Sequence, residues 1–294
     1  MSAASSGTRP GAADPQPVLE ITVVGSGPAA PQPDTPGSGL LVRAGDDHLL
    51  VDCGTGTASR LRTILDPRAL RAVVVSHLHA DHYLDLVALR YHWPWAGQPE
   101  GRLRVLLPPG GEARLAALAE AISESRSFFS QAFDVREYDP GRELCVGALR
   151  LAFIPGRHYI PAWGVSVVGP AGERFVYSSD TGPNPDLAEA ARGADLLAIE
   201  ATLEDVAEDV EERGHLTLDE ALATARRAGL DRVLITHYPS ERRAAMAAAT
   251  RGHRPRVVLA RPGLRLAVRA GQEDRAARTG GQARDEEGVA GGGS

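Results

Sequence analysis

The sequence predicts an α/β fold in which two mixed β-sheets lie face to face and helices cover their outer sides. Three observations support this prediction. Short apolar strand patterns alternate with helical patterns along most of the chain, the order of elements is similar in both halves, and polar residues follow the ends of several strands. A chain of 294 residues is long enough to bury a substantial core.

In the first half, a loop rich in Gly and Pro (25–39) separates the first two expected strands. The expected strands are short and rich in Val, Leu and Ile, and they cover residues 18–24, 40–43, 49–51, 72–75 and 103–107. The expected helices cover residues 58–65, 83–92 and 111–124.

The second half repeats this alternation of strands and helices. Its expected strands cover residues 144–154, 164–168, 174–177, 195–199, 232–235, 257–259 and 264–268. A helix is expected from about Pro185. Thr217 and Glu220 have the spacing of a capping box, which predicts the start of a further helix that ends at Gly229.

The two ends differ from the middle in composition. Residues 1–17 are rich in Ala, Ser, Gly and Pro, and residues 270–294 lack periodic apolar positions, so we expect two disordered tails around one domain of residues 18–269. No apolar run approaches the roughly 18–20 residues of a membrane span, and the N-terminal segment lacks the apolar stretch of a signal peptide. These features predict a cytoplasmic protein without a membrane partner.

The charge balance also limits the function. The net charge is −6, and every one of the 32 basic residues is Arg. Such a chain has no overall basic field to hold a long nucleic acid, whereas a small phosphate ester at a metal site needs none. Cys53 and Cys145 are the only cysteines, too few for a disulfide framework, and their apolar surroundings predict that both are buried.

The segment His77-Leu78-His79-Ala80-Asp81-His82 places three imidazoles and a carboxylate directly after the strand at 72–75. With nine histidines in 294 residues, this clustering argues against chance surface positions. A loop at the end of a strand lets His77 and His79 point to one side, and Asp81 and His82 to another. That arrangement favours two adjacent metal ions over one closed tetrahedral site.

Three further polar residues follow expected strands in the second half: His158, Asp180 and His237. Asp180 precedes Thr-Gly, so it could also be a turn residue alone. Together with the His-rich segment, the three are candidate metal ligands.

This pattern resembles the metallo-β-lactamase superfamily, whose loop motif is His-x-His-x-Asp-His, and the resemblance covers residues 18–268. It implies an αββα sandwich and two divalent metal ions, with three side chains on each ion and a seventh bridging them: His77, His79 and His158; Asp81, His82 and His237; and Asp180. Zinc suits such imidazole-rich sites, and the carboxylates leave manganese or iron open.

Two smaller features are similar to the ribonuclease Z-like branch of this superfamily. In that branch, a His at the place of His215 in Gly214-His215-Leu216-Thr217 contacts phosphate and protonates the leaving oxygen. Glu200, in Ile199-Glu200-Ala201-Thr202, would support His215, and whether it is itself catalytic stays open. The alternative for His215 is a solvated residue at a helix start.

The chain departs from the tRNA-processing members, which carry a basic arm between the ligands that match His158 and Asp180. Only 22 positions separate these two residues here, so no such arm fits. The remaining resemblance is to bacterial cyclic-nucleotide phosphodiesterases, also at Ile21–Gly27, Pro33–Gly39 and His82–Leu86. A small phosphodiester is therefore the expected partner, and the branch also allows a homodimer.

Two ions about 4 Å apart lower the pKa of a bridging water toward neutrality, and the resulting hydroxide can attack a phosphodiester. Asp81 would orient this nucleophile or accept its proton. The expected reaction opens a 3′,5′-cyclic nucleotide to a 5′-monophosphate. The alternatives are a ribonuclease Z-like tRNA 3′ endonuclease, a lactonase or thioesterase of the same superfamily, and a binding protein without catalysis.

Two other groups of residues lie near these motifs in the sequence. Aromatic side chains either pack in the core or stack on a purine: Tyr83, Trp93, Trp95 and Tyr159.

Gly54-Thr55-Gly56-Thr57 lacks the Lys of a phosphate-binding loop, so we interpret it as a tight turn against the metal loop, with Asp52 as a candidate support for a ligand.

Overall fold

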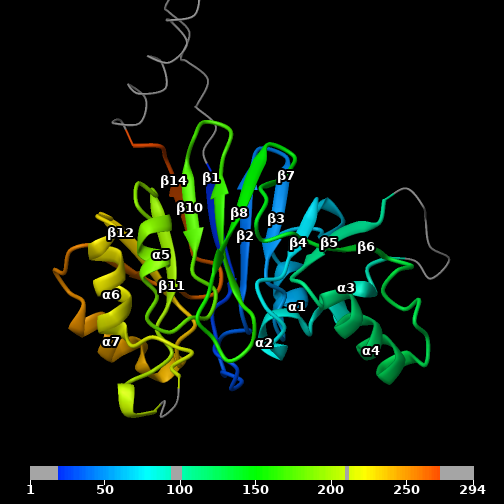
Figure 1. The fold of residues 1–294 in the computed structure, drawn as a ribbon, viewed down its shortest axis with the longest axis horizontal. Coiled ribbons are helices and arrows are strands. Elements are labelled where there is room, and N and C mark those ends of the chain that lie inside the picture. The colour runs from blue at the N-terminus through cyan, green and yellow to red at the C-terminus, as the bar shows by residue number, and fades with distance from the viewer. Residues whose placement is uncertain (1–18, 94–100, 209–211, 272–294) are drawn as a thin grey trace, which may run out of the picture.

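The computed structural model describes residues 19–93, 101–208 and 212–271. In these residues, two seven-stranded sheets lie face to face and helices cover both outer sides (Figure 1). The predicted fold class is confirmed. The N-terminal tail prediction lies outside the described residues, and so does the C-terminal one from residue 272 onward.

The first sheet combines an antiparallel half with a parallel half. Its strand order is β14-β1-β2-β3-β4-β5-β6, and β3 to β6 are parallel. The strands are β1 (Leu19–Gly25), β2 (Gly39–Ala44), β3 (Asp47–Val51), β4 (Ala72–Val74), β5 (Leu103–Leu107), β6 (Phe133–Glu137) and β14 (Arg265–Val268).

The second sheet has the same mixed character. Its order is β13-β12-β11-β10-β9-β8-β7, with β10 to β13 parallel. The strands are β7 (Leu144–Val146), β8 (Leu149–Pro155), β9 (Trp163–Val168), β10 (Arg174–Tyr177), β11 (Leu196–Glu200), β12 (Arg232–Thr236) and β13 (Arg256–Leu259).

The helices form the outer layers, and Figure 1 shows α3 and α4 beside the first sheet and α5, α6 and α7 beside the second. They are α1 (Thr57–Leu61), α2 (Ala80–Tyr83), α3 (Leu86–Arg90), α4 (Gly111–Ser123), α5 (Pro185–Ala190), α6 (Leu218–Arg227) and α7 (Arg243–Ala249). The capping box of α6 is confirmed, because Thr217 Oγ1 accepts a hydrogen bond from Glu220 N. Each described helix is too short to span a membrane.

Apolar side chains fill two separate cores. One core lies between the sheets and continues to the helices α5, α6 and α7 on the outer side of the second sheet, and the other lies between the first sheet and the helices α1, α3 and α4. Strand β2 serves both: Leu40 and Val42 belong to the first core, whereas Leu41 belongs to the second. Successive side chains of a strand point to opposite faces, so a strand buried on both faces has the continuous apolar run seen in the sequence.

Three predicted elements are wrong in their bounds, and one of them is the helix expected at 58–65, which ends at Leu61 as α1. The single strand expected at 144–154 is a hairpin, because Gly147 adopts a φ of 58° and turns the chain between β7 and β8.

Cys145 is exposed on β7, contrary to its expected burial, whereas Cys53 is buried as expected.

The helix expected at 83–92 is replaced by α2 and α3. The first begins inside the His-rich segment at Ala80, and the break falls near Asp85, whose carboxylate accepts a hydrogen bond from Ala58 N at 2.6 Å. Strand β6 and helix α7 were not predicted.

Candidate metal centre

The predicted site residues meet at one edge of the molecule because they follow strands that point in the same direction. Strands β8, β10, β11 and β12 all run toward this edge of the second sheet, and β4 runs toward the same edge of the first. The residues follow these strands: His77–His82 after β4, His158 after β8, Asp180 after β10, Glu200 at the end of β11, and His237 after β12.

The His-rich loop is fixed by backbone contacts to two neighbouring turns. Ser38 N donates to Asp81 O at 2.9 Å, and Cys53 N donates to His82 O at 2.7 Å. Gly54 lies so close that a Cβ atom there would be 1.8 Å from Asp81 O, so only glycine fits. This confirms the tight turn expected at Gly54-Thr55-Gly56-Thr57.

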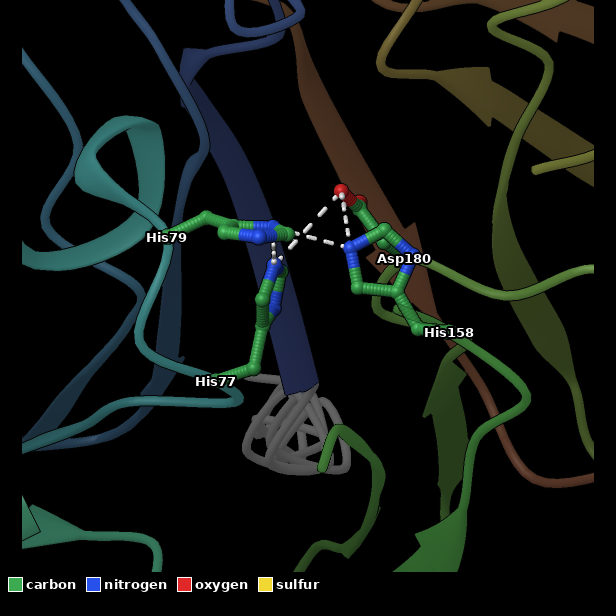
Figure 2. Close-up of side chains that lie close together, drawn as sticks. All are labelled: His77, His79, His158 and Asp180. Atoms are coloured by element: carbon green, nitrogen blue, oxygen red, sulfur yellow. Dashed lines mark hydrogen bonds and ion pairs between the residues drawn. The ribbon is translucent and has the colours of Figure 1, made fainter. Parts of the chain in front are cut away.

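The first cluster consists of His77, His79, His158 and Asp180, whose polar atoms point toward one another (Figure 2). His79 Nδ1 lies 3.2 Å from His77 Nε2 and 2.9 Å from His158 Nε2. Asp180 Oδ2 is 3.6 Å from His77 Nε2 and 3.9 Å from His158 Nε2. The side chains of His77, His158 and Asp180 are buried.

The second cluster consists of Asp81, His82, His237 and the same Asp180. His237 Nε2 lies 3.1 Å from Asp81 Oδ2, and His82 Nε2 lies 3.4 Å from His237 Nε2. Asp180 Oδ2 is 3.3 Å from His82 Nε2 and 3.5 Å from His237 Nε2. One carboxylate oxygen therefore faces both clusters, in the position that the sequence resemblance gives to a bridging ligand.

The donor atoms fit two divalent metal ions. In each cluster, one nitrogen or oxygen per residue lies within 4.8 Å of the others. Asp180 Oδ1 is buried and has no hydrogen-bond partner among the described residues. A buried oxygen without a partner is expected where a metal ion binds. Imidazole nitrogens and carboxylate oxygens suit zinc, manganese and iron. These clusters can therefore hold metal, and the choice of ion stays open.

Burial controls the protonation of the first cluster. Removal from water, reinforced by the neighbouring imidazoles, lowers the pKa of His77, His79 and His158. Low pKa values keep these rings neutral, and a neutral imidazole is the form that binds metal.

In the second cluster, neighbouring charges outweigh burial in setting the protonation of the side chains. Burial lowers the pKa of His82, but Asp180 and Asp52 outweigh it and raise this pKa well above its ordinary value. Burial likewise favours a protonated Asp81, yet hydrogen bonds from His237 and His82 hold the pKa of Asp81 far below its usual range.

Asp52 fixes the orientation of His82. Its buried carboxylate accepts hydrogen bonds from His82 Nδ1 at 2.8 Å, from Tyr177 OH at 3.0 Å, and from Ser76 N and Oγ at 2.7 and 2.9 Å. With Nδ1 held in this way, Nε2 of His82 is directed at the second cluster. Asp52 therefore supports a candidate ligand, His82, as expected from the sequence.

Strained backbone gathers at this centre. Four non-glycine residues of the described chain have a positive φ, and three adjoin the clusters: Asp52 at 63°, Ser179 at 56° and His237 at 50°. Such conformations cost free energy and persist where surrounding contacts enforce them, which is typical of functional sites.

Glu200 and His215 form a pair beside the clusters. His215 Nδ1 lies 2.9 Å from Glu200 Oε1, and Glu200 is fully buried. The His215 ring centroid is 4.9 Å from that of His158 and 5.7 Å from that of His237, and 16% of the His215 side chain is exposed. The structure therefore brings together all the residues predicted for the site.

Thr202 and Tyr177 support the site, and neither role was predicted from the sequence. Thr202 Oγ1 lies 2.8 Å from His237 Nδ1 and 2.7 Å from Glu200 Oε2, so it links a candidate ligand to the Glu200–His215 pair. Tyr177 donates to Asp52. The available signal was a tyrosine directly after the apolar residues Phe175 and Val176, because a buried tyrosine hydroxyl requires a partner.

The aromatic residues near the motifs differ in exposure. Tyr83 is buried in the helix-side core and Trp93 packs against it, which agrees with core packing. Tyr159 is 53% exposed and lies beside His158. Trp95 lies outside the described residues.

Comparisons with known proteins agree with this architecture. A model of the β-lactamase superfamily domain matches residues 47–238. An uncharacterized protein of Mycobacterium leprae, ML1173, is 35% identical over 226 residues, which cover 75% of this chain and 78% of that protein. A ribonuclease Z of Mycobacterium marinum is 31% identical over 243 residues, covering 75% of this chain and 86% of the relative.

The solved structure of YhfI, a metallo-β-lactamase fold protein of Bacillus subtilis, has a TM-score of 0.73 and 23% identity, covering 86% of this chain and 100% of that one. The likeness to YhfI supports the fold. With the domain match and the sequence relatives, it shows that this chain belongs to the metallo-β-lactamase superfamily, in its ribonuclease Z-like branch.

Proposed function

We propose that this protein is a metal-dependent phosphoester hydrolase, and more specifically a dinuclear phosphodiesterase that opens a 3′,5′-cyclic nucleotide to a 5′-monophosphate. The observation that carries this proposal is the Glu200–His215 pair, which lies against candidate ligands of both clusters. A proton donor beside two metal sites suits an ester with a poor leaving group. The relative named ribonuclease Z supports the phosphodiester class.

His215 is suited to protonate the leaving oxygen. Its Nδ1–H donates to Glu200, so Nε2 is the nitrogen left to carry the transferred proton. Glu200 also accepts hydrogen bonds from the backbone N–H groups of Thr181, Thr202 and Leu216. Those contacts hold the Glu200 side chain in place beside His215.

Asp81 is suited to hold the attacking water. Its carboxylate is charged because His237 and His82 hold its pKa far below the usual range, and 6% of its side chain is exposed, the largest fraction among the four residues of the second cluster. Two divalent ions bound at the clusters would supply a water of lowered pKa and a clamp for the phosphate oxygens. Asp81 would orient that water or take its proton.

The connection between His158 and Asp180 supports a small substrate. The antiparallel hairpin of β9 and β10, residues 163–177, fills most of these positions, which leaves no room for an RNA-binding arm. The net charge of −6 agrees with a small anionic ester and not with a long polyanion. A cytoplasmic location and a homodimer stay predictions.

The test is turnover of phosphodiesters by protein loaded with zinc or manganese. We expect hydrolysis of cyclic AMP and of bis(p-nitrophenyl) phosphate, and loss of both activities in Asp81→Ala. Failure to hydrolyse any phosphodiester would refute the proposal. If His215→Ala left the main activity intact and that activity were on a lactone or thioester, the chain would belong with the carbonyl hydrolases.

A second candidate is a tRNA 3′ endonuclease, which the name of the M. marinum relative favours. Such an enzyme would need a surface other than the missing arm to bind tRNA. Competition between precursor tRNA and cyclic AMP separates the two functions: preferred cleavage of the RNA would favour the endonuclease.

A further inference from the structure

Tyr159 stands out among the exposed side chains of the described residues. Four large hydrophobic residues there are strongly exposed, namely Tyr91, Ile122, Tyr159 and Val206. Tyr159 alone among these four has ring contacts with the site, at 4.9 Å from the His158 ring and 5.7 Å from the His215 ring. A half-exposed aromatic ring therefore borders both the first cluster and the candidate proton donor.

The backbone around Tyr159 is firmly held. Gly156 N donates to Ala162 O at 2.8 Å, and Gly182 N donates to Arg157 O at 2.6 Å. The Arg157 N–H donates to Thr181 Oγ1 at 2.9 Å, which ties the loop to the residue after Asp180. A rigidly mounted ring can bind a flat ligand without the entropy cost of ordering a loop.

Gly214 allows the ring to lie against the chain. A Cβ atom at Gly214 would be 2.6 to 2.9 Å from carbons of the Tyr159 ring, so any larger residue would displace it. Gly214 O also lies 2.8 Å from His158 Nδ1. The glycine before His215 thus positions Tyr159 and orients a candidate ligand at the same time.

A cavity of about 970 Å³ adjoins Tyr159, and its volume is within the range of small-ligand sites. The lining residues include Arg157, Glu212 and Arg213. Arg213 is paired with Glu220, whereas the side chain of Arg157 has no ion pair or hydrogen bond within the described residues. One aromatic face among charged groups suits a nucleobase with polar edges better than an acyl chain, which needs apolar walls.

We propose that Tyr159 forms the wall of a nucleobase subsite, on which the base of a phosphodiester substrate stacks while its phosphate lies at the metal centre. This inference rests on the proposed function, and it names Tyr159 as the residue that gives the enzyme its preference for a substrate with a base. Arg157 faces the same cavity and supplies hydrogen-bond donors to the edge of the base. The substrate class is therefore a nucleotide diester, in preference to a diester without a base.

The test compares cyclic AMP with a methyl riboside 3′,5′-cyclic phosphate that lacks the base. In Tyr159→Ala, KM for cyclic AMP is expected to rise about tenfold, because stacking on an aromatic ring is lost. For the base-free diester, KM should change less than about twofold. Tyr159→Phe should retain the wild-type preference, and Tyr91→Ala, an exposed tyrosine outside the site, should change neither substrate. Equal effects of Tyr159→Ala on both diesters would overturn the inference while leaving the proposed function intact.

A binding measurement separates this inference from failure of the proposed function. Calorimetry measures the affinity of the protein for adenosine 5′-monophosphate and for ribose 5-phosphate, without turnover. Tyr159→Ala should weaken the first about tenfold and leave the second unchanged. If neither diester is hydrolysed but this difference in binding appears, the subsite stands and the reaction must be revised. Unchanged binding of adenosine 5′-monophosphate would remove the subsite.

Discussion

The two clusters of the candidate metal centre share Asp180 but differ in what controls the protonation of their side chains. In the first cluster, burial and, to a smaller extent, the neighbouring imidazoles keep His77, His79 and His158 neutral, and His79 is partly exposed. In the second cluster, all four residues are buried, and a positive His82 is balanced by carboxylates.

The supports of the two clusters differ in the same way. Hydroxyl groups of Ser76 and Ser179 lie 3.1 and 3.2 Å from Nδ1 of His77, whereas a carboxylate, Asp52, contacts Nδ1 of His82. A carboxylate raises the basicity of the imidazole that it contacts, so the second cluster should hold its ion more tightly once His82 loses its proton. The ion of the first cluster should therefore exchange more readily than the ion of the second.

Removing the shared residue should have the largest effect. In Asp180→Ala, both clusters lose a ligand at once, so both ions should bind weakly. Phosphodiester turnover should fall at least about a thousandfold, since the ions supply several kcal/mol of transition-state stabilisation. Elemental analysis and the rate of bis(p-nitrophenyl) phosphate hydrolysis measure the two effects. Asp186→Ala, at an exposed carboxylate on α5, is the matched control. Two ions per chain in Asp180→Ala would contradict the shared role.

Asp52→Asn should separate the clusters. Asparagine tolerates the left-handed backbone that Asp52 adopts at a φ of 63°, so the turn is kept while the charge beside His82 is lost. We expect the affinity for one ion to fall about 10- to 100-fold, with the other ion unaffected. Competition with a chromophoric chelator resolves the two steps, and Asp46→Asn serves as an exposed control. Equal weakening of both steps would mean that the clusters are not supported independently.

The strands were predictable because most are buried on both faces and therefore have continuous apolar runs. The failures have physical causes. Gly147 is a single turn residue inside an apolar run, so the hairpin of β7 and β8 resembled one strand. Strand β6 lies at a sheet edge with two exposed charged residues at its end, and α7 is mostly alanine with only Met246 buried. Neither pattern has a clear period.

The candidate ligands were predictable because three histidines and an aspartate cluster at residues 77–82 and this motif resembles that of a known family, which implied ligand roles for the polar residues after the later strands. Their supports were harder to find. Thr202 is 35 positions from His237, and Tyr177 is 125 positions from Asp52, so only the packing of the sheets reveals these contacts. The sequence does not indicate which group the hydroxyl of a threonine or tyrosine contacts. Asp52 could be proposed because it borders a glycine turn beside the His-rich loop.

The pH dependence of metal binding should differ between the clusters. Carboxylates raise the pKa of His82, so at and below that pKa a proton occupies His82 and competes with the ion. Lowering the pH within this window should weaken the second site about tenfold per pH unit. The first site should change little, because burial lowers the pKa of its imidazoles and they are already neutral. Zinc titrations across about pH 6 to 8 measure this, and parallel slopes for both sites would contradict the assignment.

The smallest effect is expected at Thr202, which supports the second cluster through one hydroxyl group. With His237 Nε2 facing the cluster, His237 Nδ1 carries the hydrogen and donates to Thr202 Oγ1, which in turn donates to Glu200. Thr202→Val keeps the shape but removes this link, so the affinity for the second ion should fall about three- to tenfold, below the loss in Asp52→Asn. Thr202→Ser keeps the hydroxyl and should bind both ions as the wild type does. If valine weakened the first site instead, the link to His237 would not orient that ligand, and the division of supports between the clusters would have to be redrawn.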